Sequence, residues 1–148
     1  MNPIKLQQYN DVDKPYVWET YVRAMKPHIE KMWGWDNAWQ KGTFKKSLIE
    51  YETFMLLNVS ERVGYVQVKY NLESTFLSML ILSPHWQSKG IGPNILDTLQ
   101  SHYREKPITL RCFQVNKSAF DFYSNNGFEV VSTDEYFISM IRHRTMIK

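Results

Sequence analysis

Hydrophobic and polar positions along this chain change period several times, and each change marks the edge of an expected element. Within 13–29, apolar residues such as Val17, Tyr21 and Ala24 recur at helical spacing. Shorter apolar runs, alternating or continuous, predict strands. The expected strands are 4–8, 53–58, 62–70, 75–82, 108–113, 128–132 and 136–142, and the expected helices are 13–29, 36–50, 90–105 and 117–125.

The order of these elements, β-α-α-β-β-β-α-β-α-β-β, predicts an α/β protein in which helices flank a mixed sheet. No repeat, low-complexity tract or linker separates them, so residues 1–148 are expected to form a single domain. The chain has 148 residues, of which 43% are hydrophobic and 15% aromatic, so it can bury a proper core and is not expected to be disordered.

The segment after the expected strand 75–82 carries the most specific local pattern. It reads Gln-Ser-Lys-Gly-Ile-Gly over 87–92, and a helix with an apolar face follows directly. A helix N-terminus exposes backbone N–H groups and partial positive charge, and glycines let an anion approach the backbone closely. The segment therefore predicts a phosphate-binding loop. It lacks the glycine patterns of dinucleotide and nucleoside triphosphate loops, and a tight turn without a ligand is the alternative.

A second pattern covers 116–128, which reads Asn-Lys-Ser-Ala-Phe-Asp-Phe-Tyr-Ser-Asn-Asn-Gly-Phe. Asn116 is a favourable N-cap, and Ala119, Phe120 and Tyr123 fall on one face of the helix that it would begin. The asparagines and Gly127 at the far end favour helix termination, because these residues adopt a left-handed backbone at low cost.

Together the two segments resemble the GNAT superfamily of acyl-CoA-dependent N-acetyltransferases. In that family, Gln/Arg-x-x-Gly-x-Gly/Ala forms the pyrophosphate loop, and Asn-x-x-Ala-x-x-x-Tyr-x-x-x-Gly-Phe follows further along the chain. Both patterns match this sequence in order, residue type and separation. The expected order of elements is also that of the GNAT fold, so the resemblance covers nearly the whole chain.

The resemblance implies that the chain binds acetyl-CoA as a co-substrate and needs no metal. The cofactor contacts that it implies are Leu80, Ile81 and Leu82 for pantetheine, Gln87, Ser88, Lys89, Gly90, Ile91 and Gly92 for pyrophosphate, and Asn116 and Tyr123 in the second segment. Pro93 has no backbone N–H and cannot donate a hydrogen bond to pyrophosphate. Proline is nevertheless well tolerated in the first turn of a helix.

The family's motif tyrosine serves as general acid for the leaving thiolate, and the matching residue is Tyr123. A phenol with a pKa of about 10 is protonated at neutral pH and can donate to a thiolate. The alternative is that Tyr123 is simply a core aromatic. Many relatives carry a carboxylate on the strand before the loop, where this chain has Phe76 and Ser78, so no general base is assigned.

Trp33 and Trp35 lie between the first two expected helices and Trp39 lies near the start of the second, a region where GNAT enzymes commonly form the acceptor pocket. Trp33 and Trp35 are therefore the candidates for acceptor binding, by stacking or by cation–π attraction. The alternative is that these tryptophans are core anchors. Asp36 fits a helix cap better than a site for an acceptor ammonium.

The amino-acid composition of the chain limits the kinds of partner and the cellular location that we expect. The net charge of +3 and the absence of a Lys/Arg block give no support for nucleic acid. Cys112 is the single cysteine, which excludes an internal disulfide and fits a reducing compartment. No apolar run is long enough to span a membrane and no signal-peptide pattern occurs, so the expected location is the cytoplasm. The C-terminal strand pair offers a surface for a homodimer.

We therefore expect an N-acetyltransferase that moves the acetyl group of acetyl-CoA to a primary amine of a small-molecule or peptide acceptor. One alternative is a non-catalytic acyl-CoA-binding sensor or partner module, which the missing strand carboxylate favours and Tyr123 disfavours. A general phosphate-ligand binder unrelated to CoA is a second alternative.

Overall fold

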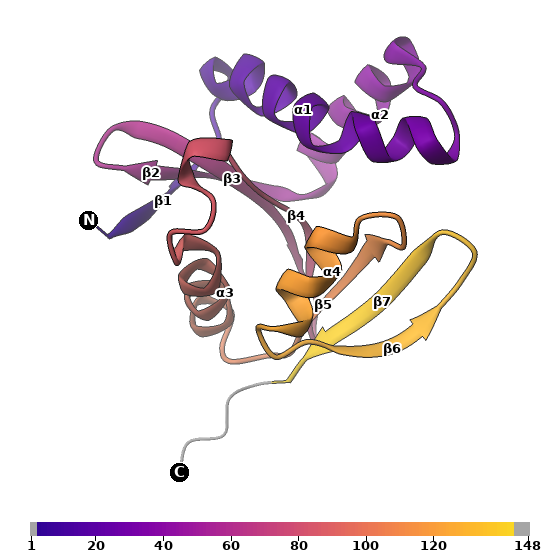
Figure 1. Ribbon diagram of the computed structural model, residues 1–148. Helices are drawn as coiled ribbons and strands as arrows, with labels where there is room; N and C mark the ends of the chain where they lie inside the picture. Colours follow the sequence, from indigo (N-terminus) through magenta and orange to yellow (C-terminus); the bar gives the residue numbers. More distant parts are fainter. Residues whose placement is uncertain (1–2, 144–148) are drawn as a thin grey trace. The chain divides into compact units, whose positions relative to one another are not determined.

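The structure is a computed structural model, which describes residues 3–143. These residues form two compact units, the first made of 3–68 with 79–92 and the second of 69–78 with 93–143. The described residues contain seven strands and four α-helices in the order β1-α1-α2-β2-β3-β4-α3-β5-α4-β6-β7 (Figure 1). This is the predicted order, and the α/β fold class is confirmed.

The first unit contains strands in the order β1-β2-β3-β4, in which β1 and β2, and β2 and β3, pair antiparallel. Its strands are β1 (Ile4–Gln8), β2 (Glu52–Asn58), most of β3 (Glu61–Tyr70) and the end of β4 (Thr75–Leu82). Gly64 lies where β3 passes very close to β4, because a Cβ at this position would be 2.3 Å from the carbonyl oxygen of Ile81. Only glycine fits this approach without a backbone shift.

Two helices, α1 (Lys14–Met32) and α2 (Asn37–Glu50), cover these strands (Figure 1). Their apolar sides meet the strands in one buried cluster that joins residues far apart in sequence. The cluster consists of Val17, Phe44, Met55, Tyr65 and Ile81. Asp36 caps α2 as predicted, since its carboxylate accepts a hydrogen bond from the Trp39 backbone N–H at 3.0 Å.

The second unit contains the start of β4, β5 (Ile108–Phe113), β7 (Phe137–Arg142) and β6 (Glu129–Thr133), in the strand order β4-β5-β7-β6. The remaining pairs are antiparallel, but β4 and β5 pair in parallel, with Thr75–Leu77 opposite Ile108–Leu110. The predicted mixture of parallel and antiparallel strands is therefore present. The helix α4 (Lys117–Ser124) packs against β5 within this unit.

Several predicted boundaries differ from the structure for local reasons. The first helix begins one residue later than predicted, after a short 3₁₀ turn at Asp11–Asp13, and continues past Ile29 to Met32. The predicted helix 90–105 is α3 (Ile91–His102), and it stops early because Arg104 and Glu105 have φ angles of +62° and +60°. Gly42 lies inside α2, which runs through it without interruption.

Candidate active site

The loop after β4 is held in place by side chains and backbone of the first unit. The Gln87 amide donates a hydrogen bond to the Leu82 carbonyl at 3.0 Å, and the Ser83 backbone N–H donates to the Val63 carbonyl at 2.9 Å. The Trp86 indole donates to the Glu61 carboxylate at 3.2 Å. These bonds attach the loop at three points to the strand ends that precede it.

Between these attachments and α3 the chain makes a sharp turn. Ser88 and Gly90 have φ angles of +59° and +79°, and residues 87–90 are exposed. A helix leaves the N–H groups of its first turn without intrahelical partners, which here applies to Ile91 and Gly92, while Pro93 has no N–H to offer. The loop therefore presents backbone donors, with Lys89 as an exposed cation beside them, to an anionic group.

The end of β4 supplies the residues expected to contact pantetheine. Leu80, Ile81 and Leu82 lie beyond the part of β4 that pairs with β5. Ile81 is buried in the cluster of the first unit, whereas Leu80 and Leu82 are half-buried. Because strand side chains alternate, the two leucines face away from the cluster that holds Ile81.

In the second unit, the 116–128 segment forms a short helix closed at both ends. The Asn116 side chain accepts a hydrogen bond from the Ala119 N–H at 3.1 Å, which confirms the predicted cap. At the far end the Phe128 N–H donates to the Tyr123 carbonyl at 3.1 Å, and Gly127 takes a φ of +89°. The segment therefore fixes the position of Tyr123 within its own unit.

Tyr123 is 9% exposed, and its ring packs edge-on against Phe122 and Phe128, with centroids 5.2 Å away in both cases. Burial, and secondarily the nearby Cys112 thiol, raise the pKa of Tyr123 well above its ordinary value. Among the described residues its hydroxyl has no hydrogen-bond partner. Tyr123 is therefore a neutral phenol, and its hydroxyl hydrogen is available to a ligand.

The tryptophans of the α1–α2 region have different environments. Trp35 is half-buried, and its ring lies 6.3 Å from that of Trp18 and 6.2 Å from that of Tyr21. Trp33 and Trp39 are 49% and 62% exposed, so neither is a core anchor. Two lysines also lie near this group, with Lys26 Nζ 5.8 Å from the Trp35 ring and Lys41 Nζ 5.9 Å from the Trp18 ring.

The predicted site residues thus fall in both units. The first unit holds Leu80–Leu82, Gln87–Gly92, Trp33 and Trp35, and the second holds Asn116 and Tyr123. Sequence reasoning did not single out Trp18 or the hydrogen bond of 2.7 Å between Tyr16 Oη and Ser83 Oγ. Residues 16 and 83 are distant in the chain, and no local spacing marks such a pair.

The described residues contain neither a candidate metal site nor a helix that could span a membrane. Within 3–143, no three His, Cys, Asp or Glu side chains gather in a way that could hold a metal ion. No helix in the same residues has the length and apolar character that crossing a membrane requires.

The fold is shared with solved acetyltransferases. The PaiA N-acetyltransferase of Thermoplasma acidophilum, solved with coenzyme A, superposes with a TM-score of 0.74 at 18% identity over 95% of this chain and 98% of that one. A GNAT family acetyltransferase of Elizabethkingia anophelis with acetyl-CoA bound has a TM-score of 0.72 at 12% identity, covering 97% and 99% of the two chains. The ribosomal-protein-S18-alanine N-acetyltransferase of Escherichia coli has 0.70 at 18%, covering 98% and 96%.

At sequence identities of 18%, 12% and 18%, these similarities show a shared fold alone. No curated protein sequence matches the chain. The family model of the acetyltransferase (GNAT) domain, however, matches residues 26–148, which include both the loop and the Tyr123 segment. The chain therefore belongs to the GNAT family of acetyltransferases.

Proposed function

We propose that this protein is an N-acetyltransferase that moves the acetyl group of acetyl-CoA to a primary amine by direct attack. The observation that carries the proposal is Tyr123, a buried neutral phenol whose hydroxyl hydrogen has no partner among the described residues. Such a group has the chemistry of a general acid that remains protonated throughout the physiological pH range.

In the proposed reaction, the amine nitrogen attacks the thioester carbon and the C–S bond breaks with its electron pair moving to sulfur. Tyr123 transfers its proton to sulfur as the negative charge develops there. Because the phenol is a weaker acid than a thiol, whose pKa is about 8.5, this transfer is favourable only when it is coupled to loss of a proton from the attacking nitrogen. The proton released by the attacking nitrogen restores Tyr123 through solvent.

The proposed cofactor contacts divide by chemistry. Backbone donors of Gln87–Gly92 and the Lys89 ammonium would bind pyrophosphate, and the main chain of Leu80–Leu82 would pair with pantetheine. Asn116 would serve chiefly as the cap that sets the orientation of α4. The exposed turn at Ser88 and Gly90 supports this assignment, because it leaves the loop backbone open to an anion.

The acceptor must present a neutral amine, although a free alkylamine has a pKa of about 10.4. We propose that solvent removes the proton, because Phe76 and Ser78 occupy the strand positions where a carboxylate would serve. Trp33 and Trp35 are the proposed acceptor contacts. The acceptor class includes small amines and peptides, and the relatives with solved structures include one that acts on an alanine of a ribosomal protein.

The test measures release of free CoA from acetyl-CoA with a panel of polyamines, amino acids, aminoglycosides and short peptides. Wild type is compared with Tyr123→Phe, and Tyr70→Phe is the control because Tyr70 is a partly exposed tyrosine of the same unit. We expect amine-dependent release that falls in Tyr123→Phe and is unchanged in Tyr70→Phe. Acetyl-CoA binding without release for any amine would favour the alternative of a non-catalytic acyl-CoA-binding module.

A further inference from the structure

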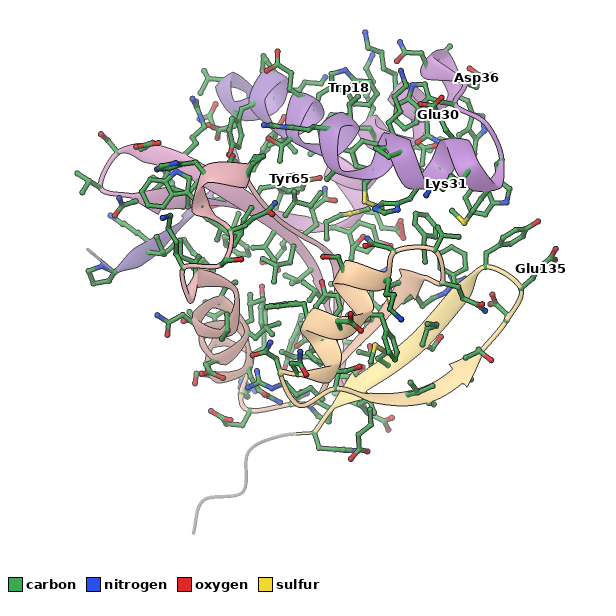
Figure 2. All side chains as sticks on the ribbon, in the orientation of Figure 1. Trp18, Glu30, Lys31, Asp36, Tyr65 and Glu135 are labelled. Atoms are coloured by element: carbon green, nitrogen blue, oxygen red, sulfur yellow. The ribbon has the colours of Figure 1, made fainter. Side chains whose placement is uncertain are left out.

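Tyr65 is a fully buried tyrosine of the first unit. It lies on β3, opposite Met55 of β2, and none of its surface is exposed. Among the described residues its hydroxyl has no hydrogen-bond partner. Figure 2 shows Tyr65 between α1, which carries Trp18, and the strands of this unit.

An unpartnered buried hydroxyl lowers folding stability, because it has lost water without gaining a partner. Thr20 on α1 is buried and unpartnered too, but a threonine hydroxyl can rotate toward a carbonyl of its own helix. Tyr65 has no such local remedy, since its oxygen is held at the end of a packed ring. Its hydrogen therefore points to a partner that the folded chain does not itself supply.

The two hydroxyl groups that influence the pKa of Tyr65, those of Tyr16 and Tyr21, already have hydrogen-bond partners. Tyr16 shares a hydrogen bond with Ser83, and Tyr21 donates to the Gln40 side-chain oxygen at 2.8 Å. Burial, with smaller contributions from Tyr21 and Tyr16, raises the pKa of Tyr65, and burial raises that of Tyr21 to about 12. Tyr65 and Tyr21 are therefore neutral at physiological pH, and such buried surroundings suit an uncharged oxygen better than a carboxylate or phosphate.

Two of the side chains that pack against this cluster are flexible methionines. Met25 of α1 and Met79 of β4 are half-buried and lie against it. Methionine is unbranched and adapts its shape readily. Met25 and Met79 are therefore the side chains whose movement would open this cluster to a small polar group.

We propose that Tyr65 determines acceptor specificity by donating its hydroxyl hydrogen to an uncharged carbonyl oxygen of the amine substrate. The substrate class is then a primary amine that also carries an amide or similar carbonyl. This inference rests on the proposed function, which supplies the amine. The acceptor is favoured over the cofactor because Trp18 and Tyr21, which pack against the cluster of Tyr65, also lie beside the ring of Trp35, a proposed acceptor contact. Of the proposed cofactor contacts, Ile81 belongs to this cluster, so the affinity for acetyl-CoA is measured as well.

The experiment compares matched acceptors with and without a carbonyl, namely glycinamide with ethylamine and 4-aminobutanamide with butylamine. KM and kcat are measured for wild type, Tyr65→Phe and the control Tyr70→Phe. One lost neutral hydrogen bond corresponds to about a tenfold rise in KM. We expect that rise for at least one amide in Tyr65→Phe, with no change for its alkylamine partner. Because each variant is compared with wild type on the same amine, differences in amine basicity cancel.

Binding is measured separately from turnover by calorimetry with each amide at saturating CoA, and acetyl-CoA affinity is measured alone. Amide binding that weakens in Tyr65→Phe without any acetyl transfer would support the carbonyl site and contradict the proposed function. Acetyl transfer with equal amide KM values for wild type and Tyr65→Phe would overturn the role of Tyr65 and leave the proposed function intact. A weaker affinity for acetyl-CoA in Tyr65→Phe would also overturn it, because the oxygen would then belong to the cofactor.

Discussion

Tyr65 and Tyr123 are both buried tyrosines with raised pKa values, yet different kinds of neighbours hold them. Tyr123 is fixed by residues of its own short segment, from the Asn116 cap to Phe128. Tyr65 is enclosed by side chains from α1, α2, β2 and β4. A local segment can therefore keep its geometry while the rest of the chain changes, whereas the environment of Tyr65 depends on the packing of the whole first unit.

Of the substitutions that test this difference between the two tyrosines, Tyr123→Phe should have the largest effect, and the effect should be on catalysis. Tyr123→Phe removes the proposed proton donor and keeps the ring, and loss of a general acid costs on the order of 100-fold in kcat. We expect the affinity for acetyl-CoA to change less than twofold, since the pyrophosphate loop is untouched. Steady-state kinetics with the best amine of the panel measures the effect. An unchanged kcat would remove Tyr123 from the mechanism.

A glycine next to Tyr65 tests how strongly its environment depends on distant strands. Gly64→Ala forces a methyl group to within 2.3 Å of the Ile81 carbonyl oxygen, so β3 and β4 must separate. We expect a loss of about 2 kcal/mol in the free energy of unfolding, as for an overpacked core.

The matched control is Gly42→Ala, where a new methyl group meets nothing within 4 Å on a helix. That change should stabilise the protein by about 1 kcal/mol through helix propensity. Urea unfolding of both variants gives the two values. Equal effects of the two substitutions would contradict the close approach of β3 and β4.

Two tyrosine-to-phenylalanine changes in the first unit should have opposite signs. Tyr16→Phe removes the partner of the Ser83 hydroxyl and should cost about 1 kcal/mol. Tyr65→Phe removes a buried hydroxyl that has no partner among the described residues, so the ligand-free protein should be as stable as wild type or slightly more so. Thermal unfolding without ligand measures both. Destabilisation by Tyr65→Phe would mean that its hydroxyl is hydrogen-bonded in the ligand-free protein.

The smallest effect expected of Tyr123 is on the pH profile below pH 10. The raised pKa of Tyr123 lies above its ordinary value of 10, so the proposed acid keeps its proton through pH 10. Activity should therefore rise with pH as the amine loses its proton, with no fall below pH 10. Rate measurements between pH 6 and pH 10 at saturating acetyl-CoA test this; a fall near pH 8 would point to a different acid.

The raised pKa values of the two tyrosines also predict how the stability of the protein depends on pH. A group whose pKa is raised by folding contributes its full stabilisation below its unfolded pKa and loses it as the pH rises through the folded value. Tyr65 and Tyr123 are neutral in the folded and the unfolded state below pH 10; above pH 10 the unfolded chain ionises first, so the stability of the folded state should fall as the pH rises further.

The sequence predicted correctly the features that depend on nearby residues. The order of elements, the caps at Asp36 and Asn116 and the position of Gly127 all depend on neighbours within a few residues, and the structure agrees with them. The early end of α3 was missed because Arg104 and Glu105 adopt left-handed angles that side chains of this type rarely take.

The non-local features left no comparable pattern in the sequence. Tyr65 lies in a run from Val63 to Val68 that is buried throughout, so periodicity marks a core strand and says nothing about an unpartnered hydroxyl. The hydrogen bonds of Gln87 with Leu82 and of Trp86 with Glu61 depend on the path of the loop. Gln87 was predicted as a phosphate contact from its motif, and its side chain also closes the loop onto β4.

The burial of Cys112 has a practical consequence for these measurements. It is the chain's single cysteine, it is buried, and burial raises the pKa of its thiol, so little reactive thiolate exists at assay pH. A thiol-reactive dye should therefore report released CoA with almost no background from the folded protein. When the second unit opens, the same dye should label Cys112, so one reagent can follow both turnover and local unfolding.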